Sequence, residues 1–220
     1  MKSILKNLKK NQVFLENVRC NYPSLDKAQK FNADDENEEG KYTIEVLIPK
    51  KDKETIAAIK TYVTNIIQKS DKLKVGQKQA AKKKALDWAD AYNVYAILKD
   101  GDKQNEKREA EEKEVRVQYK DHMILRLKKK ESNGRPLVVD EQATQIPDMS
   151  IREEIQSGYW VNVAFSAFAY AYQGNPGVSV SLSGVQKVKE DEVFGQENPF
   201  SELAPIEEED LSENPFDEAV

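Results

Sequence analysis

Apolar and polar residues alternate most regularly between residues 154 and 189, where two strand patterns flank the turn sequence Gly174-Asn175-Pro176-Gly177. This alternation predicts a long β-hairpin with a four-residue loop. The odd positions of the first strand taper from large to small side chains, which suits a curved sheet packed on a core: Tyr159, Val161, Val163, Phe165, Ala167, Ala169 and Ala171.

The even positions of that strand form a face that is too polar for a core and too aromatic for an ordinary solvated surface. They are Trp160, Asn162, Ala164, Ser166, Phe168, Tyr170 and Tyr172. Flat rings on a wettable surface can stack on the bases of single-stranded nucleic acid, because every base has a π-face whatever its sequence. The alternative is that a bulge reverses the register, or that a loop or helix covers the rings and makes them a second small core.

The first half of the chain combines strands with two helices. Residues 12–22 are expected to form a strand, and the alternation at 41–48 predicts a half-buried strand that Pro49 ends. Asp52 can accept a hydrogen bond from a free first-turn amide, and apolar residues at helical spacing then predict a helix to about residue 70. A second helix is expected at 77–92, with one apolar stripe: Ala81, Ala85, Trp88 and Tyr92.

The next segment predicts short strands and connectors. Residues 93–98 are expected to form a short strand, and residues 103–113 are charged enough to be a mobile connector. Residues 114–130 indicate a strand, a turn near Lys120-Asp121 and a second strand, and residues 136–140 indicate one more strand. One parity of residues 114–130 is a basic row: Arg116, Gln118, Lys120, His122, Arg126 and Lys128.

At least five strands, interrupted by a two-helix insertion, indicate a mainly β fold in the form of a barrel with a helical elaboration. An open α+β sheet is the alternative, since periodicity does not separate the two.

The charges are distributed unevenly along the chain. The net charge is −5, yet residues 190–220 contain 12 of the 39 Asp and Glu residues and no Lys or Arg. Residues 1–189 therefore carry 34 Lys and Arg against 27 Asp and Glu, a formal charge of +7. A basic body with an acidic arm suggests a polyanion ligand and an interaction tail.

A run of six lysines in the expected insertion can follow phosphates without reading bases, although a solvated helix face is the alternative. These residues are Lys72, Lys74, Lys78, Lys82, Lys83 and Lys84.

The residues for catalysis are sparse. Cys20 is the only cysteine and His122 the only histidine, so neither a zinc site of ordinary spacing nor a Cys-His pair can be built with any redundancy. The phosphate-binding loop pattern G-x-x-x-x-G-K-[ST] is absent as well. We therefore expect no catalytic residue, no metal and no cofactor.

Two other function classes stay open. A magnesium-dependent nuclease needs converging carboxylates, for which the candidates are Asp100, Asp102, Asp140 and Glu141. A DNA-mimic interaction protein is the other, but a mimic would be acidic throughout, whereas residues 1–189 are basic.

A single cysteine permits no disulfide within the chain, which fits a reducing compartment. The first residues lack an apolar run long enough for a signal peptide, and no segment approaches a membrane span. The expectation is a soluble cytosolic protein without a membrane partner, whose oligomeric state the sequence leaves open.

Several motifs together resemble a family of tailed-phage single-stranded DNA-binding proteins. They are V-R-C-N-Y-P at 18–23, G-K-Y-T-I-E-V-L-I-P-K at 40–50 and, within 135–189, R-P-L-V-V-D, I-Q-S-G-Y-W-V-N-V, F-A-Y, G-N-P-G-V and L-S-G-V-Q-K-V-K. The resemblance implies an OB-fold-like five-stranded barrel at 1–189, with the helical insertion at about 52–92, and a disordered acidic tail at 190–220. It also implies sequence-nonspecific binding of single-stranded DNA during phage replication or recombination, in the cytoplasm of the infected bacterial host.

Two groups of side chains are then expected to contact DNA. Stacking on bases is assigned to Trp160, Phe168, Tyr170 and Tyr172. Contacts with phosphates are assigned to Arg116, Lys120, Arg126, Lys128, Lys82 and Lys83.

The acidic tail contains a repeat, E-N-P-F-S-E at 197–202 and E-N-P-F-D-E at 213–218. Proline stiffens the segment, phenylalanine offers an apolar anchor and the acids steer it towards a basic pocket. The repeat is similar to the tails of bacterial single-stranded DNA-binding proteins, although here Asp-Glu-Ala-Val follows the second Phe. Phe200 and Phe216 are thus expected to recruit phage replication proteins such as a DNA polymerase, while the tail competes with DNA for the basic body. The alternative is that Phe200 packs on the barrel and the remaining tail only adds solubility.

Overall fold

The computed structural model describes residues 4–9, 12–30, 35 and 38–195 of the chain. Its sheet has the strand order β4-β5-β3-β2-β7-β8-β6, and β1 pairs with β2 outside this path. The strands are β1 Ile4–Lys9, β2 Gln12–Gln29, β3 Lys41–Pro49, β4 Leu98–Asp100, β5 His122–Lys130, β6 Leu137–Val139, β7 Trp160–Tyr172 and β8 Asn175–Lys189. The pairs are antiparallel except β6 with β8, which is parallel.

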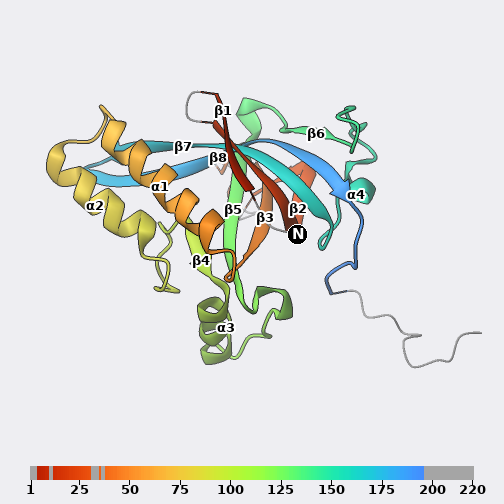
Figure 1. The fold of residues 1–220 in the computed structure, drawn as a ribbon, viewed down its shortest axis with the longest axis horizontal. Coiled ribbons are helices and arrows are strands. Elements are labelled where there is room, and N and C mark those ends of the chain that lie inside the picture. The colour runs from red at the N-terminus through yellow and green to blue at the C-terminus, as the bar shows by residue number, and fades with distance from the viewer. Residues whose placement is uncertain (1–3, 10–11, 31–34, 36–37, 196–220) are drawn as a thin grey trace, which may run out of the picture.

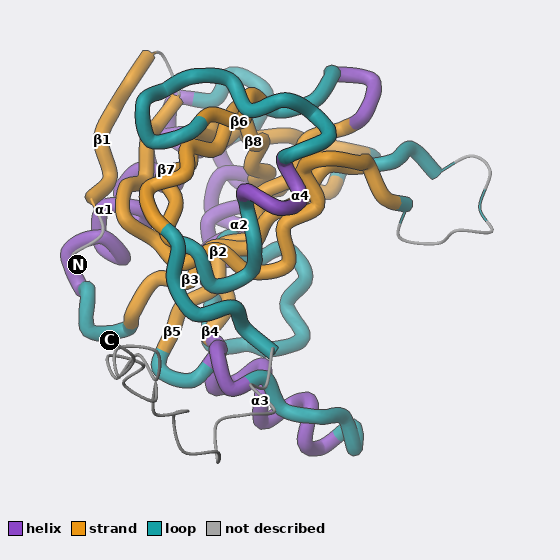
Figure 2. Tube along the Cα trace, turned by 90° about the vertical axis from the view of Figure 1, so that its right-hand side faces the viewer, coloured by secondary structure: helices purple, strands orange, loops and turns teal. Residues whose placement is uncertain are grey.

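The sheet curls into a barrel, because β8 returns to contact β5 although the two are not neighbours in the strand order. Between β3 and β4 the chain inserts α1 Lys53–Lys69 and α2 Val75–Leu86, which lie beneath the tip half of the β7-β8 hairpin (Figure 1). The helix α3 Gly101–Ala110 projects from the bottom of the barrel in both views, and α4 Ile151–Glu154 precedes β7 (Figure 2). The predicted mainly β barrel with a helical insertion is confirmed.

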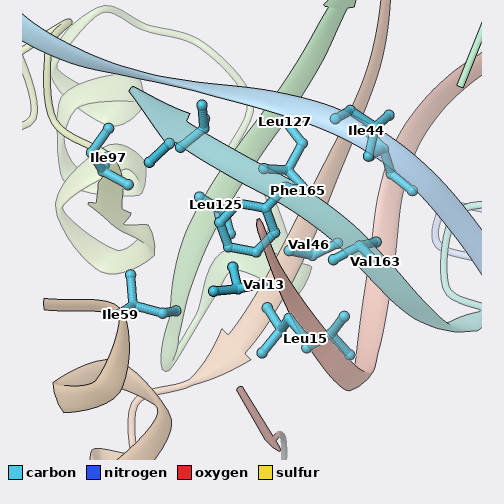
Figure 3. Packing of buried hydrophobic residues seen from close by; sticks show 14 of the residues in the cluster. Val13, Leu15, Ile44, Val46, Ile59, Ile97, Leu125, Leu127, Val163 and Phe165 are labelled. Carbon is cyan, nitrogen blue, oxygen red and sulfur yellow. The ribbon is translucent and has the colours of Figure 1, made fainter. Parts of the chain in front are cut away.

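One apolar core fills the barrel and continues under α1 and α2 (Figure 3). The odd positions of β7 from Val161 to Ala169 point into it, as the alternation predicts, whereas Ala171 is exposed at the hairpin tip. The largest fully buried side chains are Phe165, Leu15, Leu25, Ile44, Leu47, Ile48, Ile59, Ile67, Leu98, Leu125, Leu127 and Leu182.

Tyr62 anchors α1 to the hairpin. Its ring meets Phe165 edge-on, with 6.1 Å between ring centroids, and its hydroxyl accepts a 2.7 Å hydrogen bond from the backbone N–H of Ala167. The last residue of β7 that pairs with β2 is Ser166, so the hydroxyl satisfies an amide beyond the end of that ladder.

The hairpin turn differs from the prediction. Tyr172 pairs with Asn175, so the loop is only Gln173-Gly174. Both loop residues have positive φ, 47° and 79°, as in the two-residue turns whose twist matches paired strands. Pro176 belongs to β8, where it is tolerated because β6 pairs with β8 only from Gly184 onward and leaves this edge free of ladder bonds.

Two predicted elements have other bounds. β2 continues past residue 22 to Gln29, because a bulge with positive φ at Tyr22 lets the strand bend and resume its pairing. The second helix ends at Leu86 rather than residue 92, so Tyr92 lies in a turn and is 64% exposed. Trp88 packs partly buried against the core, as predicted.

The segment from residue 93 to residue 121 departs furthest from the prediction. The short strand is 98–100, and the predicted connector at 103–113 is largely α3, which begins where the Asp100 carboxylate accepts hydrogen bonds from the N–H groups of Asp102 and Lys103. Residues 114–121 form no strand but a loop with a short 3-10 helix, Val117–Tyr119. The predicted strands at 41–48 and 136–140, and the helix capped by Asp52, are confirmed. Among the described residues, no helix is long and apolar enough to cross a membrane.

We expect Tyr62→Phe to lower the free energy of unfolding by about 1 kcal/mol, because the Ala167 amide loses its acceptor while the ring keeps its packing. Urea unfolding measures the change. Tyr172→Phe is the matched control, because it removes a tyrosine hydroxyl from the hairpin that Tyr62 contacts. The Tyr172 side chain is 69% exposed, so its loss should leave stability unchanged. Equal stability of the two variants would contradict the anchoring role of the Tyr62 hydroxyl.

Candidate nucleic-acid interface

A groove of about 580 Å³ lies where β3, β5, the segment after α2, α3, the 111–119 loop and the hairpin meet. Its lining contains two carboxylates, Glu45 and Glu111, and seven cationic side chains, Lys99, Lys107, Arg108, Lys113, Arg116, Arg126 and Lys128. Three tyrosines, Tyr95, Tyr119 and Tyr170, also line it. The groove is therefore a basic channel with aromatic walls.

Glu45 organises the floor of this groove. It is 3% exposed, and its Oε2 accepts hydrogen bonds from the Asn21 amide at 3.0 Å and from the Tyr119 hydroxyl at 2.7 Å. Its Oε1 accepts from both Nε and Nη2 of Arg126, the residue opposite it on β5. Burial raises the pKa of the Tyr119 hydroxyl and the Glu45 carboxylate raises it further, so this hydroxyl keeps its proton.

Arg126 is held by this carboxylate while its side chain stays 62% exposed. Burial by itself would lower the pKa of its guanidinium, but the charge and hydrogen bonds of Glu45 hold that pKa above its ordinary value. Arg126 is thus a fixed, permanently charged group at the surface of the floor.

Arg116 is placed by backbone and side-chain contacts together. The Asn105 amide of α3 donates to the Arg116 carbonyl at 2.9 Å, and the Asn105 carbonyl accepts from the Arg116 N–H at 3.0 Å. The guanidinium donates to the Tyr119 hydroxyl at 2.5 Å and lies 4.5 Å from the ring centroid of Tyr22. Asn105 belongs to α3, a helix that the sequence did not predict. This helix therefore positions Arg116, which the sequence did predict as a phosphate contact.

Two lysines of the groove are held close to other charges. Burial lowers the pKa of Lys99, and Arg126 and Lys107 lower it further. Burial also lowers the pKa of Lys128, with added repulsion from Lys41 and Arg126. An anion in the groove would relieve this repulsion, because it would stabilise the charged form of both lysines.

Tyr170 reaches the groove by crossing β8. A Cβ atom at Gly177, its partner on β8, would lie only 2.5 Å from the Tyr170 hydroxyl, so the glycine makes room for the ring. Phe168 and Tyr172 flank Tyr170 on the same face of β7 and are 47% and 69% exposed. The rings near the hairpin tip are therefore not covered by a second core.

Trp160 lies on a row of paired residues that crosses the outer face of the sheet. The register places Ile124, Leu47, Arg19, Trp160 and Lys189 side by side on β5, β3, β2, β7 and β8. The next row contains Arg126, Glu45 and Asn21, so Trp160 shares the face of the groove without lining it.

The first residues after β8 cover part of that row. The Asp191 carboxylate accepts a 2.6 Å hydrogen bond from the Trp160 indole and lies 3.4 Å from a guanidinium nitrogen of Arg19. Phe194 packs on Leu47, Tyr119 and Ile124, with the Arg19 guanidinium 4.6 Å from its ring centroid. Residues 191–194 thus run along the edge of the groove.

The structure brings together four of the predicted contact residues: Arg116, Arg126, Lys128 and Tyr170. Lys120 is exposed but does not line the groove, and Lys82 and Lys83 are exposed on α2. Phe200 and Phe216 lie outside the described residues.

Sequence reasoning missed several residues of the groove: Tyr95, Lys99, Lys107 and Lys113. Tyr95 carried a signal, because Tyr-Asn-Val-Tyr directly follows the lysine-rich helix. The lysines at 99, 107 and 113 carried none, since Lys99 lies in β4 and Lys107 in α3, beyond the predicted elements, and Lys113 lies in the loop after α3.

The carboxylates considered for a nuclease are engaged in the fold. Asp100 and Asp102 both accept hydrogen bonds from the Lys50 ammonium, at 2.5 and 2.6 Å. Asp140 accepts from the backbone N–H groups of Gln142 and Thr144 in its own turn, and Glu141 lies 4.0 Å from Lys187. In the part of the chain that the structure describes, no group of three or more His, Cys, Asp or Glu side chains is arranged to hold a metal ion.

The model of a family described as "Enterobacter phage Enc34, ssDNA-binding protein" matches residues 11–212. The chain belongs to this family of phage single-stranded DNA-binding proteins. No curated protein sequence matches it.

Two solved structures share the fold. The single-stranded DNA-binding protein of bacteriophage Enc34 in complex with ssDNA has a TM-score of 0.63 and 23% identity, covering 88% of this chain and 99% of that one. Its C-terminal truncation has a TM-score of 0.61 and 22% identity, covering 88% and 98%. The OB-fold-like class predicted for this family member is confirmed.

We expect Glu45→Ala to lower the free energy of unfolding by on the order of 3 kcal/mol. The substitution removes the carboxylate acceptor of the buried Asn21 amide and of the buried Tyr119 hydroxyl. Urea unfolding tests this, with Glu109→Ala on the exposed face of α3 as a control. If both variants lost equally little stability, the Glu45 contacts would not hold the groove floor together.

Proposed function

We propose that this protein binds single-stranded DNA without sequence preference, with the strand lying in the groove on the outer face of the barrel. The observation that carries the proposal is the excess of seven cationic side chains over two carboxylates in a channel that also has aromatic walls. Cations that follow the backbone and rings that accept any base are the two parts of sequence-tolerant single-strand binding.

The roles within the groove follow from its geometry. Lys99 and Lys128 contact phosphates, because neighbouring cations repel their charges and an anion would relieve that repulsion. Arg116 and Arg126 also contact phosphates, because hydrogen bonds hold their guanidinium groups in the groove. Tyr170 stacks on a base, and Phe168 and Tyr172 extend the stacking surface towards the hairpin tip. Trp160 lies one row beyond the floor, and Lys120, Lys82 and Lys83 lie outside the groove, so their contacts with DNA stay predictions of the sequence.

The biological role that we propose is to coat single-stranded DNA during phage replication or recombination in the infected host cell. Coating keeps the strand unpaired and away from nucleases. Membership of a phage single-stranded DNA-binding family supports this role.

The salt dependence of binding tests the groove. Each phosphate contact with a single strand contributes about 0.7 to the slope of log affinity against log salt. Lys99→Ala combined with Lys128→Ala should reduce that slope by about 1.4 for a labelled oligothymidylate. These two lysines are preferable to Arg126, because replacing Arg126 would also remove the ion-pair partner of the buried Glu45.

Lys51→Ala combined with Lys60→Ala removes the same charge from an exposed site away from the groove and should leave the slope unchanged. Duplex DNA of the same sequence should bind more weakly than the single strand, since its bases are already stacked. An unaltered slope in the groove variant, or equal affinity for the duplex, would contradict the proposed binding path.

We also propose that the acidic tail competes with DNA and recruits replication partners through Phe200 and Phe216. The contacts of Asp191 and Phe194 along the edge of the groove support a tail that starts close to the binding face. A tethered polyanion reaches an effective concentration of about millimolar near the site, enough to compete at low salt.

A truncation after Gly195 keeps the Asp191 and Phe194 contacts and removes only the rest of the tail. It should bind oligothymidylate more tightly at low salt, as measured by fluorescence anisotropy, and lose association with the phage polymerase. Phe200→Ala with Phe216→Ala should lose the polymerase but keep DNA affinity. Unchanged affinity of the truncated chain at low salt would exclude competition, and a double variant that still bound the polymerase would exclude docking through these rings.

A further inference from the structure

The loop at residues 87–97, between α2 and β4, is firmly attached at both sides. The Asn93 amide donates to the carbonyls of Lys84 and Asp87 at 2.7 and 3.0 Å, and its side-chain oxygen accepts from the N–H of Tyr95 at 3.0 Å. The Gln104 amide of α3 donates to the Ala91 carbonyl at 3.0 Å. The loop therefore has one defined shape although it lies at the surface.

This loop presents aromatic rings to solvent. Tyr95 is 46% exposed and Tyr92 is 64% exposed. Each has a lysine over its ring, Lys84 at 5.1 Å from the Tyr95 centroid and Lys107 at 4.2 Å from the Tyr92 centroid. Of the two tyrosines, only Tyr95 lines the groove.

Tyr95 and Tyr170 line the same groove from two separate parts of the chain. Tyr95 comes from the loop after α2, and Tyr170 comes from the hairpin. Ile97, Val178 and Val180 contribute apolar surface to the same lining. Burial raises the pKa of Tyr170, and the Tyr95 phenol in the same groove raises it further.

We propose that Tyr95 is a second base-stacking residue and that a nucleobase of the bound strand lies between Tyr95 and Tyr170. The proposal rests on the proposed function and adds a subsite to it. Lys84 covers one face of the Tyr95 ring and leaves the other for a base, while its charge lies close enough to attract the adjoining phosphate. A rigid loop loses little conformational entropy when the base enters, which favours binding.

The subsite explains why the insertion matters for the binding face. The loop continues α2, and Ile97 is tied back to that helix by its N–H, which donates to the Ala85 carbonyl at 3.1 Å. The insertion thus lines one part of the groove, and the barrel, α3 and the 111–119 loop line the rest. A duplex would be excluded, because a paired base cannot enter the space between two rings.

The test compares two ligands of equal length, an oligothymidylate and the same sugar-phosphate chain with abasic positions. Tyr95→Ala should weaken binding to the oligothymidylate by about 5-fold to 150-fold, the range for loss of one stacked base. Its affinity for the abasic chain and its salt slope should stay those of the wild type, because no phosphate contact is removed. Tyr95→Phe should bind both ligands normally.

Tyr92→Ala is the matched control, since it removes an exposed, lysine-paired tyrosine from the same loop but outside the groove lining. It should bind within about twofold of the wild type. Urea unfolding of each variant separates binding effects from loss of the fold.

The outcomes distinguish this inference from the function on which it rests. A wild-type protein that binds neither ligand would overturn the proposed function itself. A wild type that binds oligothymidylate, with a Tyr95→Ala variant of equal affinity, would overturn only the Tyr95 subsite. A Tyr95→Ala variant that loses affinity for both ligands equally would also overturn it, because the ring would then support binding of the sugar-phosphate chain and not of a base.

Discussion

The groove on the outer face of the barrel depends on one buried carboxylate, that of Glu45. A charge that is 3% exposed is tolerated only when hydrogen bonds and an opposite charge compensate for its lost hydration. Glu45 meets this condition with Asn21, Tyr119 and Arg126, which come from three separate parts of the chain. The same contacts that satisfy the carboxylate fix Arg126 directly and Arg116 through Tyr119.

The barrel and its insertion divide the work of building the groove. The barrel supplies the floor, because β3 pairs with β5 along its whole length and with β2 on its other side. The insertion supplies a wall, held to the hairpin by Tyr62 and to α3 by Gln104. Each attachment is a hydrogen bond between a side chain and a backbone group, and the bond from Gln104 holds the 87–97 loop to α3.

The outer face carries more than the groove. The row that contains Leu47, Arg19 and Trp160 continues the same surface and is partly covered by the residues that follow β8. The Asp191 carboxylate accepts a hydrogen bond from the Trp160 indole and pairs with the Arg19 guanidinium there. The acidic residues that follow β8 therefore lie next to basic residues of the outer face. An anion that binds near Trp160 would meet Asp191.

The sequence by itself determined the elements whose signal is local. Alternation specified β3, β7 and most of β8, and a side-chain cap with helical spacing specified α1, because these patterns report burial on one face of a single element. The tertiary structure alone decided the groove. Arg116 lies in a loop, not a strand, and is placed by Asn105 of an unpredicted helix. Tyr95 and Tyr170 line the same groove although they are 75 positions apart in the sequence. Residues so far apart in the sequence come together only through the pairing of distant strands and through hydrogen bonds between side chains and polar groups of other elements. Local periodicity contains no information on either.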